Sequence, residues 1–311
     1  MKFNVKEYVL AGVVALLLTA CHAKHTDDTL TWDCINVNAH TQQGDAHLFS
    51  KDGKHVLVDA GHISYSKRFL LPLLQKREVK QIDDVLISHP HNDHYSGVKA
   101  LFENNISIRT LHMNMPTKEQ MDREYWGGTF SELLEIKQLA LKHGTKVIPI
   151  RQGDKITFDK NCFMKVLYVY NGIDTPVGKT DINDMSAIMM VYHGKNRFLL
   201  TGDLNKKLGK YLAENANDIE ADILKFPHHG TESFAPNSFF EKVHPKVLIV
   251  PSPKFLWSSK RSKRARMLAK EKGYKTYVSG YNGLITVISD GAGYAITTEV
   301  SVNDILNKGN K

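Results

Sequence analysis

The chain has 311 residues, of which 42% are hydrophobic and 24% charged, the mix of an ordinary globular protein with a sizeable core. This composition excludes a disordered, collagenous or coiled-coil chain. The 41 Lys and Arg residues outnumber 33 Asp and Glu, and the net charge of +8 suits an anionic partner without selecting one. Three cysteines are too few for a disulfide-framed miniprotein or a cysteine-rich zinc module, whereas fifteen histidines are unusually many.

The N-terminus has the pattern of an export signal. Basic residues precede an apolar run, Tyr8 to Leu18, which is too short for a permanent membrane span but fits a secretory signal. The run ends in Leu18-Thr19-Ala20-Cys21, which resembles the bacterial lipobox, where the cysteine is lipidated and becomes the first mature residue. We therefore expect removal of residues 1–20, a lipid anchor on Cys21 at the extracytoplasmic face of the cell membrane, and a tether over 21–29. A plain anchor helix or a simple secretory signal is the alternative.

Strand and helix patterns alternate along the rest of the chain, and no low-complexity linker or internal repeat interrupts residues 30–300, so residues 30–311 are predicted to form one domain. The predicted strands cover 30–37, 46–50, 55–59, 84–88, 106–112, 146–150, 163–170, 186–193, 197–201, 222–226, 246–250, 275–279 and 284–289. The predicted helices cover 66–75, 97–103, 118–143, 205–213, 236–242 and 262–272. This order favours a layered α/β domain over a helical bundle or a pure β-sandwich.

Two further cysteines lie in the predicted strands. Cys34 and Cys162 have no ligand-type spacing, and both stand in apolar runs. Buried free thiols are therefore the simpler interpretation, and pairing in an oxidising space after export is the alternative.

A dense group of metal-ligating residues follows the predicted strand 84–88. The segment His89-Pro90-His91-Asn92-Asp93-His94 contains three imidazoles and a carboxylate within six residues, enough to hold two divalent cations. Strand-like alternation turns His89 and His91 the same way, and Asp93 and His94 can complete a second site as the chain enters the next helix. A chance cluster of histidines is the alternative, but such a cluster would bring no packing benefit.

Two later strands end in residues of the same kind. Strand 197–201 is followed by Gly202-Asp203, and strand 222–226 by Pro227-His228-His229-Gly230-Thr231. Loops at strand ends, fixed by Gly and Pro, are how a rigid sheet presents ligands at one edge. Gly202-Asp203 alone is a weak turn signal, but the three segments together, in this order, predict a metal site.

These motifs resemble those of metallo-β-lactamase-fold hydrolases, in the pattern His89-x-His91-x-Asp93-His94, then Asp203, then His229. The similarity to one branch covers about residues 30–290 and includes segments 43–46, 58–61, 198–203 and 225–231. That branch is the extracellular nuclease-like domain of bacterial competence DNA-channel proteins, the ComEC family. The resemblance implies a four-layer αββα sandwich, two divalent metal ions and hydrolysis of a phosphate ester. It does not include the membrane channel of that family, so it implies nothing about transport.

The resemblance also implies six metal ligands: His89, His91, Asp93, His94, Asp203 and His229. The first two would hold one metal, Asp203 would bridge both, and the other three would complete the second site. His228 would be a catalytic or substrate-contacting neighbour, although the sequence leaves open which of the two adjacent histidines is the ligand. Asp59 would orient a ligand imidazole by a hydrogen bond.

The sequence departs from most of the superfamily at one position. A histidine is usual between the first cluster and the bridging Asp, but the corresponding stretch 181–186 contains none. The competence branch is Asn-rich there as well, and Asn183 or Asp184 would supply an extra ligand. An added oxygen ligand would favour Mn²⁺ over Zn²⁺. The predicted cofactor is therefore two divalent ions, Zn²⁺ or Mn²⁺.

Two cations about 3.5–4 Å apart would lower the pKa of a shared water and clamp the oxygens of an in-line displacement, with Asp93 orienting the hydroxide. The predicted reaction is therefore phosphodiester hydrolysis by a metal-bridging hydroxide. A basic run follows the last ligand and includes Trp257, Lys260, Arg261, Lys263 and Arg264. Such a run would track a nucleic-acid backbone while the tryptophan stacks on a base. A solvated basic helix face is the alternative.

The sequence thus predicts a surface-anchored phosphodiesterase acting on nucleic acid, single-stranded DNA in particular, with no obligate protein partner evident. One alternative is an esterase of phosphorylcholine or another cell-wall phosphodiester. Another is a metal-holding binding lipoprotein without turnover, against which the complete ligand cluster argues. A β-lactamase is disfavoured because the third histidine is missing and Asp203 stands where one lactamase class has a cysteine.

Overall fold

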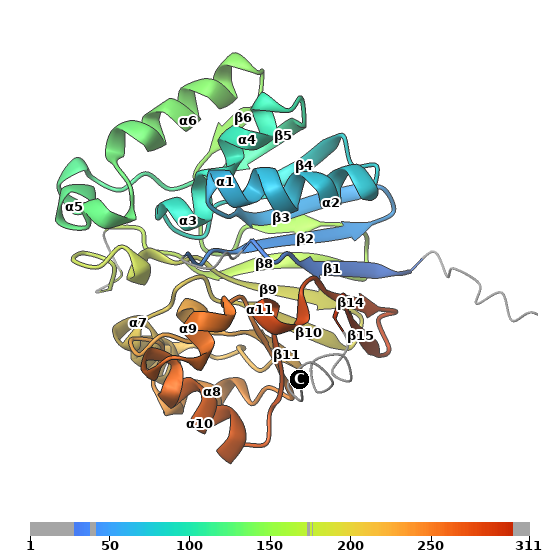
Figure 1. Ribbon diagram of the computed structural model, residues 1–311, viewed down its shortest axis with the longest axis vertical. Helices are drawn as coiled ribbons and strands as arrows, with labels where there is room; N and C mark the ends of the chain where they lie inside the picture. Colours follow the sequence, from blue (N-terminus) through green and yellow to red (C-terminus); the bar gives the residue numbers. More distant parts are fainter. Residues whose placement is uncertain (1–27, 38–41, 173–174, 176, 301–311) are drawn as a thin grey trace, which may run out of the picture.

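Two β-sheets stack face to face, and helices cover the outer face of each (Figure 1). The computed structural model describes residues 28–37, 42–172, 175 and 177–300. The predicted signal, Cys21 and most of the predicted tether lie outside the described residues. Within the described ranges, no helix is both long enough and apolar enough to cross a membrane.

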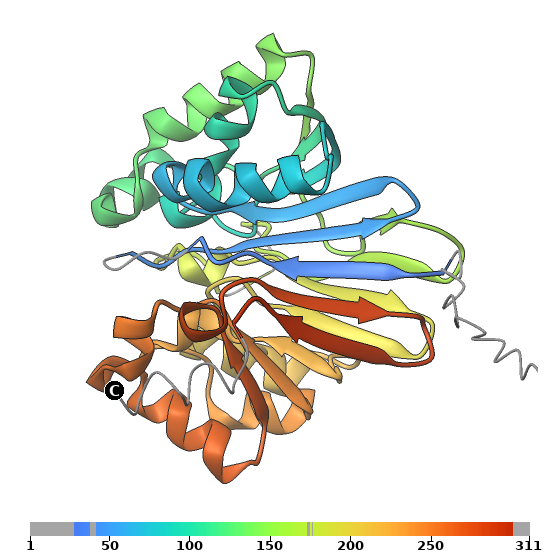
Figure 2. The same ribbon diagram turned by 45° about the vertical axis from the view of Figure 1, so that its right-hand side comes forward.

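The first sheet has eight strands in the order β15-β14-β1-β2-β3-β4-β5-β6. Their bounds are β1 Leu30–Cys34, β2 Ala46–Lys51, β3 Lys54–Ala60, β4 Gln81–Leu86, β5 Ser107–His112, β6 Lys146–Ile148, β14 Ile285–Ser289 and β15 Tyr294–Thr298. The late strand β14 pairs antiparallel with β1, so the two ends of the described chain meet in this sheet (Figure 2). β3 to β6 run parallel, and their carboxyl ends therefore lie at one edge.

The second sheet has seven strands in the order β13-β12-β11-β10-β9-β8-β7. Their bounds are β7 Lys155–Thr157, β8 Cys162–Tyr168, β9 Ile188–His193, β10 Asn196–Leu200, β11 Ile223–Lys225, β12 Val247–Val250 and β13 Lys275–Val278. β10 to β13 are parallel, which again gathers their carboxyl ends at one edge.

The helices fall into two groups (Figure 1). On the first sheet lie α1 Ile63–Tyr65, the π-helical turn η1 Ser66–Leu70, α2 Leu71–Lys76, α3 Asn92–Tyr95, α4 Gly97–Glu103, α5 Lys118–Arg123, the 3₁₀ turn η2 Tyr125–Gly127 and α6 Phe130–Lys142. On the side of the second sheet lie α7 Lys206–Asn215, α8 Asn237–Val243, α9 Lys254–Ser258, α10 Lys263–Glu271 and α11 Ser279–Asn282. Three further 3₁₀ turns are η3 Asn183–Met185, η4 Pro227–Gly230 and η5 Lys260–Ser262.

Apolar side chains fill the three spaces between the four layers. Alternation along each strand divides them: in β3, Val56 and Val58 face the second sheet, whereas Leu57 faces the helices. The outer core beneath the second sheet includes Leu208 of α7 and Phe239 of α8. The four-layer αββα sandwich predicted from the sequence is thus confirmed.

The main difference from the predicted elements is in the long helix expected over 118–143. It is two helices, α5 and α6, separated by the turn that holds η2. Gly128 has φ of +119°, which side chains rarely allow, and Thr129 starts α6 with a capping box that includes Glu132. Cys34 and Cys162 are both buried free thiols.

Contact between Phe198 of β10 and Trp32 of β1 joins the two sheets, since their ring centroids are 5.8 Å apart and both side chains are fully buried. We predict that Phe198→Ala lowers the free energy of unfolding by about 3–5 kcal/mol, because the sheets cannot close the cavity it leaves. Ile288→Ala, at a 42% exposed position, is the control and should cost much less. Guanidinium unfolding measures both, and equal losses would contradict the role of this contact.

Candidate metal centre

The predicted ligands meet at the edge where parallel strands of both sheets end. The segment His89 to His94 follows β4, Asp203 follows β10, and His229 follows β11. Each strand lies in a buried sheet, so the position of each ligand is set by the packing of the two sheets rather than by a mobile loop.

Four side chains form the centre of the site, and each offers a ligand atom within 4.8 Å of the others: Asp93, His94, Asp203 and His229. His229 Nε2 lies 3.1 Å from Asp203 Oδ2 and 3.5 Å from Asp93 Oδ2. His94 Nε2 lies 3.4 Å from Asp203 Oδ1. Among the described residues, both Nε2 atoms and Asp203 Oδ1 are buried without a hydrogen-bond partner. Buried polar atoms are almost always satisfied, so this donor set fits a bound cation.

His89 and His91 lie beside this centre. His89 Nε2 is 3.2 Å from His91 Nδ1, and the His89 ring centroid is 4.1 Å from that of His94. Burial, together with the charge of His94, holds the pKa of His89 well below its usual value. Its ring is therefore neutral, which is the form that binds a metal. The pair adds two imidazoles beside this centre.

Asp59 orients His94 from behind. Its Oδ2 lies 2.8 Å from His94 Nδ1, and its two oxygens accept from the backbone and side chain of Ser88, each at 2.7 Å. His229 has an equivalent partner, because its Nδ1 donates to the carbonyl of Pro251 at 2.8 Å. These bonds direct both Nε2 atoms toward the centre.

Asn183 and Asp184 face different ways. Asn183 lines the same cavity as Asp93 and Asp203, and its Oδ1 is buried without a hydrogen-bond partner in the described part of the chain. Asp184 instead accepts from Leu208 N of α7 at 3.4 Å, and burial raises its pKa to about 7. Asp184 therefore does not fit the role of extra ligand, whereas Asn183 does.

The adjacent histidines on η4 have different surroundings. Both have φ near the left-handed region, +50° for His228 and +52° for His229, a strain of about 1–3 kcal/mol each. His228 Nδ1 lies 2.9 Å from Asn205 Oδ1, and its Nε2 is 3.8 Å from Asp203 Oδ2. Burial lowers the pKa of His228 to about 4, so the ring is neutral at pH 7. The geometry favours His229 as the ligand and places His228 at the cavity wall.

A buried ion pair beneath the centre, between Lys225 and Asp45, had no predicted role. Lys225 Nζ contacts Asp45 Oδ2, lies 3.6 Å from Asp203 Oδ1 and donates to the carbonyl of Gly202 at 2.6 Å. Burial lowers the pKa of Lys225, but the two carboxylates outweigh it and leave the pKa above its usual value. The lysine therefore stays charged and offsets part of the negative charge. The sequence does carry a sign of this buried charge, because Lys225 is a single lysine within an otherwise apolar strand pattern.

Glu124 is a second residue that the sequence did not reveal. Its Oε2 lies 3.0 Å from His91 Nε2, and its Oε1 accepts from Ile182 N at 2.9 Å. Glu124 therefore fixes the ring of His91 with Nδ1 toward His89, and it ties the neighbouring segment that carries Asn183 to the site. The break between α5 and α6 puts it there.

The residues of the predicted basic run fall into two groups in the structure: some are held within the fold and the others are exposed. Trp257 is only 8% exposed, and its ring centroid lies 6.2 Å from that of Phe226 in the core, so the base stacking predicted for it does not fit its position. Arg264 donates to the carbonyls of Phe234 and Ala235 at 3.0 and 2.7 Å, which commits it to the fold. The remaining basic residues of the predicted contact set are exposed: Lys260, Arg261 and Lys263.

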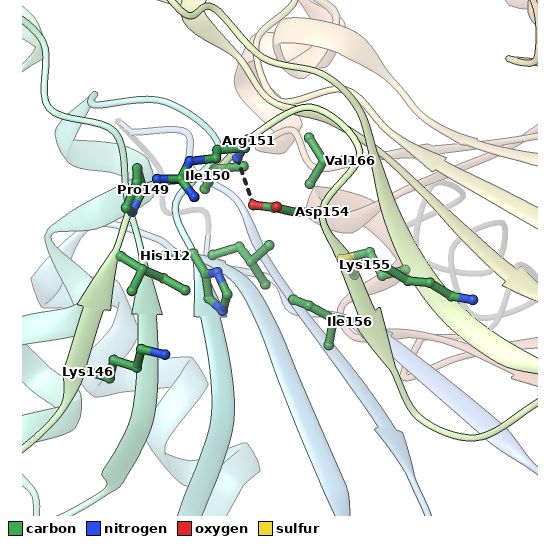
Figure 3. Close-up of a pocket in the computed structure, with 12 residues that line it drawn as sticks. His112, Lys146, Pro149, Ile150, Arg151, Asp154, Lys155, Ile156 and Val166 are labelled. Atoms are coloured by element: carbon green, nitrogen blue, oxygen red, sulfur yellow. Dashed lines mark hydrogen bonds between the residues drawn. The ribbon is translucent and has the colours of Figure 1, made fainter.

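The metal centre opens into a cavity of about 480 Å³, which Arg261 also lines. A separate cavity of about 350 Å³ lies where β5 and β6 face β7 and β8 (Figure 3). His112 faces it from β5 and Ile156 from β7, and His112 Nε2 lies 2.8 Å from Asp84 Oδ1. None of the described residues that line this second cavity is a predicted ligand, so the chemistry belongs to the first.

Residues 41–140 match the family model described as the metallo-beta-lactamase superfamily. This stretch of the chain is therefore similar to a metallo-β-lactamase superfamily domain. YhfI from Bacillus subtilis, a solved metallo-beta-lactamase fold protein, superimposes with a TM-score of 0.52 at 14% identity, over 83% of this chain and 100% of YhfI. This likeness shows the fold of the metallo-β-lactamase domain.

Two curated relatives bear out the resemblance to competence proteins at low identity. ComE operon protein 3 of Bacillus subtilis (strain 168) is 24% identical over 191 residues, which are 61% of this chain and 22% of that protein. Recombination protein 2 of Haemophilus influenzae is 26% identical over 247 residues, which are 78% of this chain and 26% of that protein. The chain therefore spans about a quarter of the length of these relatives.

We predict that Glu124→Ala weakens the affinity for Mn²⁺ or Zn²⁺ about 10- to 100-fold, because His91 loses the carboxylate that orients it. Glu124→Gln keeps one acceptor oxygen and should recover part of the loss. Glu119→Ala, on the preceding helix α5 and with a 77% exposed side chain, is the control and should leave affinity unchanged. Calorimetric metal titration measures this, and equal affinities in the two alanine variants would contradict the role of Glu124.

Proposed function

We propose that this protein hydrolyses phosphodiesters with divalent metal ions and that nucleic acid is its substrate. The observation that carries the proposal is the group of buried, unpartnered ligand atoms on His94, Asp203 and His229, next to the adjacent imidazoles of His89 and His91. Members of the metallo-β-lactamase superfamily are generally metal-dependent hydrolases, which supports the same class of reaction.

Two divalent cations on these residues would supply Lewis acidity and a hydroxide nucleophile at neutral pH. Asp203 faces His94 with Oδ1 and His229 with Oδ2. Burial raises its pKa, but His229 and His94 outweigh burial and hold the pKa well below its usual value, so the carboxylate stays ionised. The side chain of Asp93 is 18% exposed at the cavity, where it can accept a hydrogen bond from the attacking group. His228 lines the same cavity and can contact a phosphate oxygen.

Charge supports nucleic acid as the substrate. The chain carries +8, and Arg261 lines the cavity of the metal centre with Lys260 and Lys263 exposed nearby in sequence. Polyanions bind such surfaces by releasing counterions. The similarity to a recombination protein and to a protein of a competence operon points the same way.

We predict that Asp203→Ala lowers hydrolysis of both bis(4-nitrophenyl) phosphate and single-stranded DNA to the level of chelator-treated protein, because the site loses the buried carboxylate that faces both His94 and His229. Asp218→Ala, at a 61% exposed surface ion pair with Arg197, is the control and should keep full activity. Elemental analysis should show bound metal in the control. Activity that survives the chelator, or that survives in Asp203→Ala, would refute the proposal.

We also propose that a lipid on Cys21 anchors the protein to the extracytoplasmic face of the membrane. The support is the Leu18-Thr19-Ala20-Cys21 motif after the apolar run. Cys21→Ser should move the protein from the membrane fraction to the soluble fraction in its native host, with unchanged activity per molecule, because only the attachment site is lost. His22→Ser is the control and should remain with membranes. A Cys21→Ser protein that still sediments with membranes after a high-salt wash would contradict the anchor.

A further inference from the structure

Two large aromatic side chains are exposed at the cavity of the metal centre. Trp126 is 65% exposed and Phe255 is 46% exposed, and both line the cavity that also holds Asp93 and Asp203. They come from opposite halves of the sandwich, Trp126 from η2 and Phe255 from α9. Single exposed hydrophobic side chains are ordinary, but two that converge on one polar cavity mark a surface that a ligand covers.

The turn that carries Trp126 is fixed against the metal centre. A Cβ on Gly127 would lie 2.3 Å from His91 Cδ2, and a Cβ on Gly128 would lie 2.2 Å from Tyr95 Oη, so the backbone rests directly on both side chains. Glu124, just before the turn, holds it through bonds to His91 and Ile182. Trp126 is therefore positioned before any ligand binds, which lowers the entropic cost of binding.

Phe255 is held in a similar way. Its neighbours on α9, Leu256 and Trp257, are buried and anchor the helix to the core. A Cβ on Gly280 would lie 2.3 Å from Lys254 N, so α11 packs closely against the start of α9. The exposed ring of Phe255 thus projects from a helix that is fixed on its other faces.

The charge at the cavity selects the kind of ligand. Arg261 lines the cavity with an exposed guanidinium, and its Nε lies 3.2 Å from Glu232 Oε2, a surface pair that a phosphate can replace. Aromatic faces combined with a nearby cation suit a polynucleotide, whose bases stack while its phosphates pair with the positive charge. A choline headgroup also binds aromatic faces, but the positive charge of Arg261 at the same cavity disfavours it.

We propose that Trp126 and Phe255 stack on bases beside the scissile phosphate and that Arg261 contacts an adjacent phosphate, so that the site takes single-stranded nucleic acid. Bases in a duplex already stack on one another and offer no free faces to the two rings. This inference rests on the proposed function and specifies its substrate.

Tryptophan fluorescence tests the inference without relying on activity. Of the three tryptophans, Trp32 is fully buried and Trp257 is 8% exposed, so quenching by a ligand reports on Trp126. The full-length chain with Asp203→Asn would be titrated with oligo(dT), because this variant should leave the strand uncut. We expect saturable quenching with oligo(dT), and none with the same length of duplex.

Matched variants and a strand without bases then test whether the two rings stack on bases. In the same background, Trp126→Ala and Phe255→Ala should each weaken oligo(dT) binding about 5- to 150-fold, measured by anisotropy of a labelled strand. Leu141→Ala is the control, because Leu141 is 56% exposed but does not line the cavity, and it should bind as the parent does. An abasic strand of the same length should bind more weakly to the parent, and Trp126→Ala should weaken it no further.

The outcomes separate this inference from the proposed function. Leu141→Ala in the otherwise unaltered chain should keep both its kcat on bis(4-nitrophenyl) phosphate and its KM for single-stranded DNA, whereas Trp126→Ala should raise that KM. Equal binding by Trp126→Ala and Leu141→Ala, or quenching by phosphorylcholine but not by oligo(dT), would overturn the inference even if the reporter is hydrolysed. Conversely, quenching and base-dependent binding without any hydrolysis would retain the aromatic contacts and refute the proposed function.

Discussion

A buried carboxylate is the constraint on which the rest of the site depends. Asp203 is 1% exposed, and a charge in such a place is tolerated only when other charges and hydrogen bonds compensate for it. His94 approaches it from the segment after β4 at 3.4 Å, and His229 and Lys225 approach it from the end of β11 at 3.1 and 3.6 Å. None of these groups belongs to the same segment as Asp203, so the compensation exists only in the assembled fold.

The elements around this carboxylate are correspondingly tight. Gly202 has φ of +49°, and a Cβ there would lie 2.7 Å from Ser186 Oγ, the same atom that accepts the Asp203 N–H at 3.0 Å. Lys225 binds the carbonyl of Gly202 from the other side. Backbone strain at His228 and His229 turns their rings toward different neighbours. Strain and close backbone approach are thus concentrated where ligand atoms must be held without freedom to move.

The groups that contact substrate in our proposals come from a different kind of element. The metal ligands follow strands of the sandwich, whereas Trp126 and Phe255 come from short helical turns added at its edge. Glu124 links the added turn to the metal ligands, because it lies directly before η2 and hydrogen-bonds His91. A change of substrate within this architecture therefore requires new turns at the cavity rather than a new sheet arrangement.

Local residue order was enough for the fold class, most strands and the ligand segments. Two of these features can be read from residues that are close together in the chain. They are the hydrophobic alternation in β3 and β10 and the clustering of His89 to His94. The prediction was wrong for the helix over 118–143, because helical periodicity concealed the break at Gly128, which depends on contact with Tyr95 far away in the chain.

Tertiary packing alone decided the partners of each charged or aromatic group. Asp184 faces α7 while Asn183 faces the cavity, and Trp257 is buried while Phe255 is exposed, although each pair is nearly adjacent in sequence. Lys225 and Asp45 are separated by almost the whole domain and still form one buried ion pair. Such pairings follow from how two sheets and their connecting turns meet in space, and no local pattern encodes that distance.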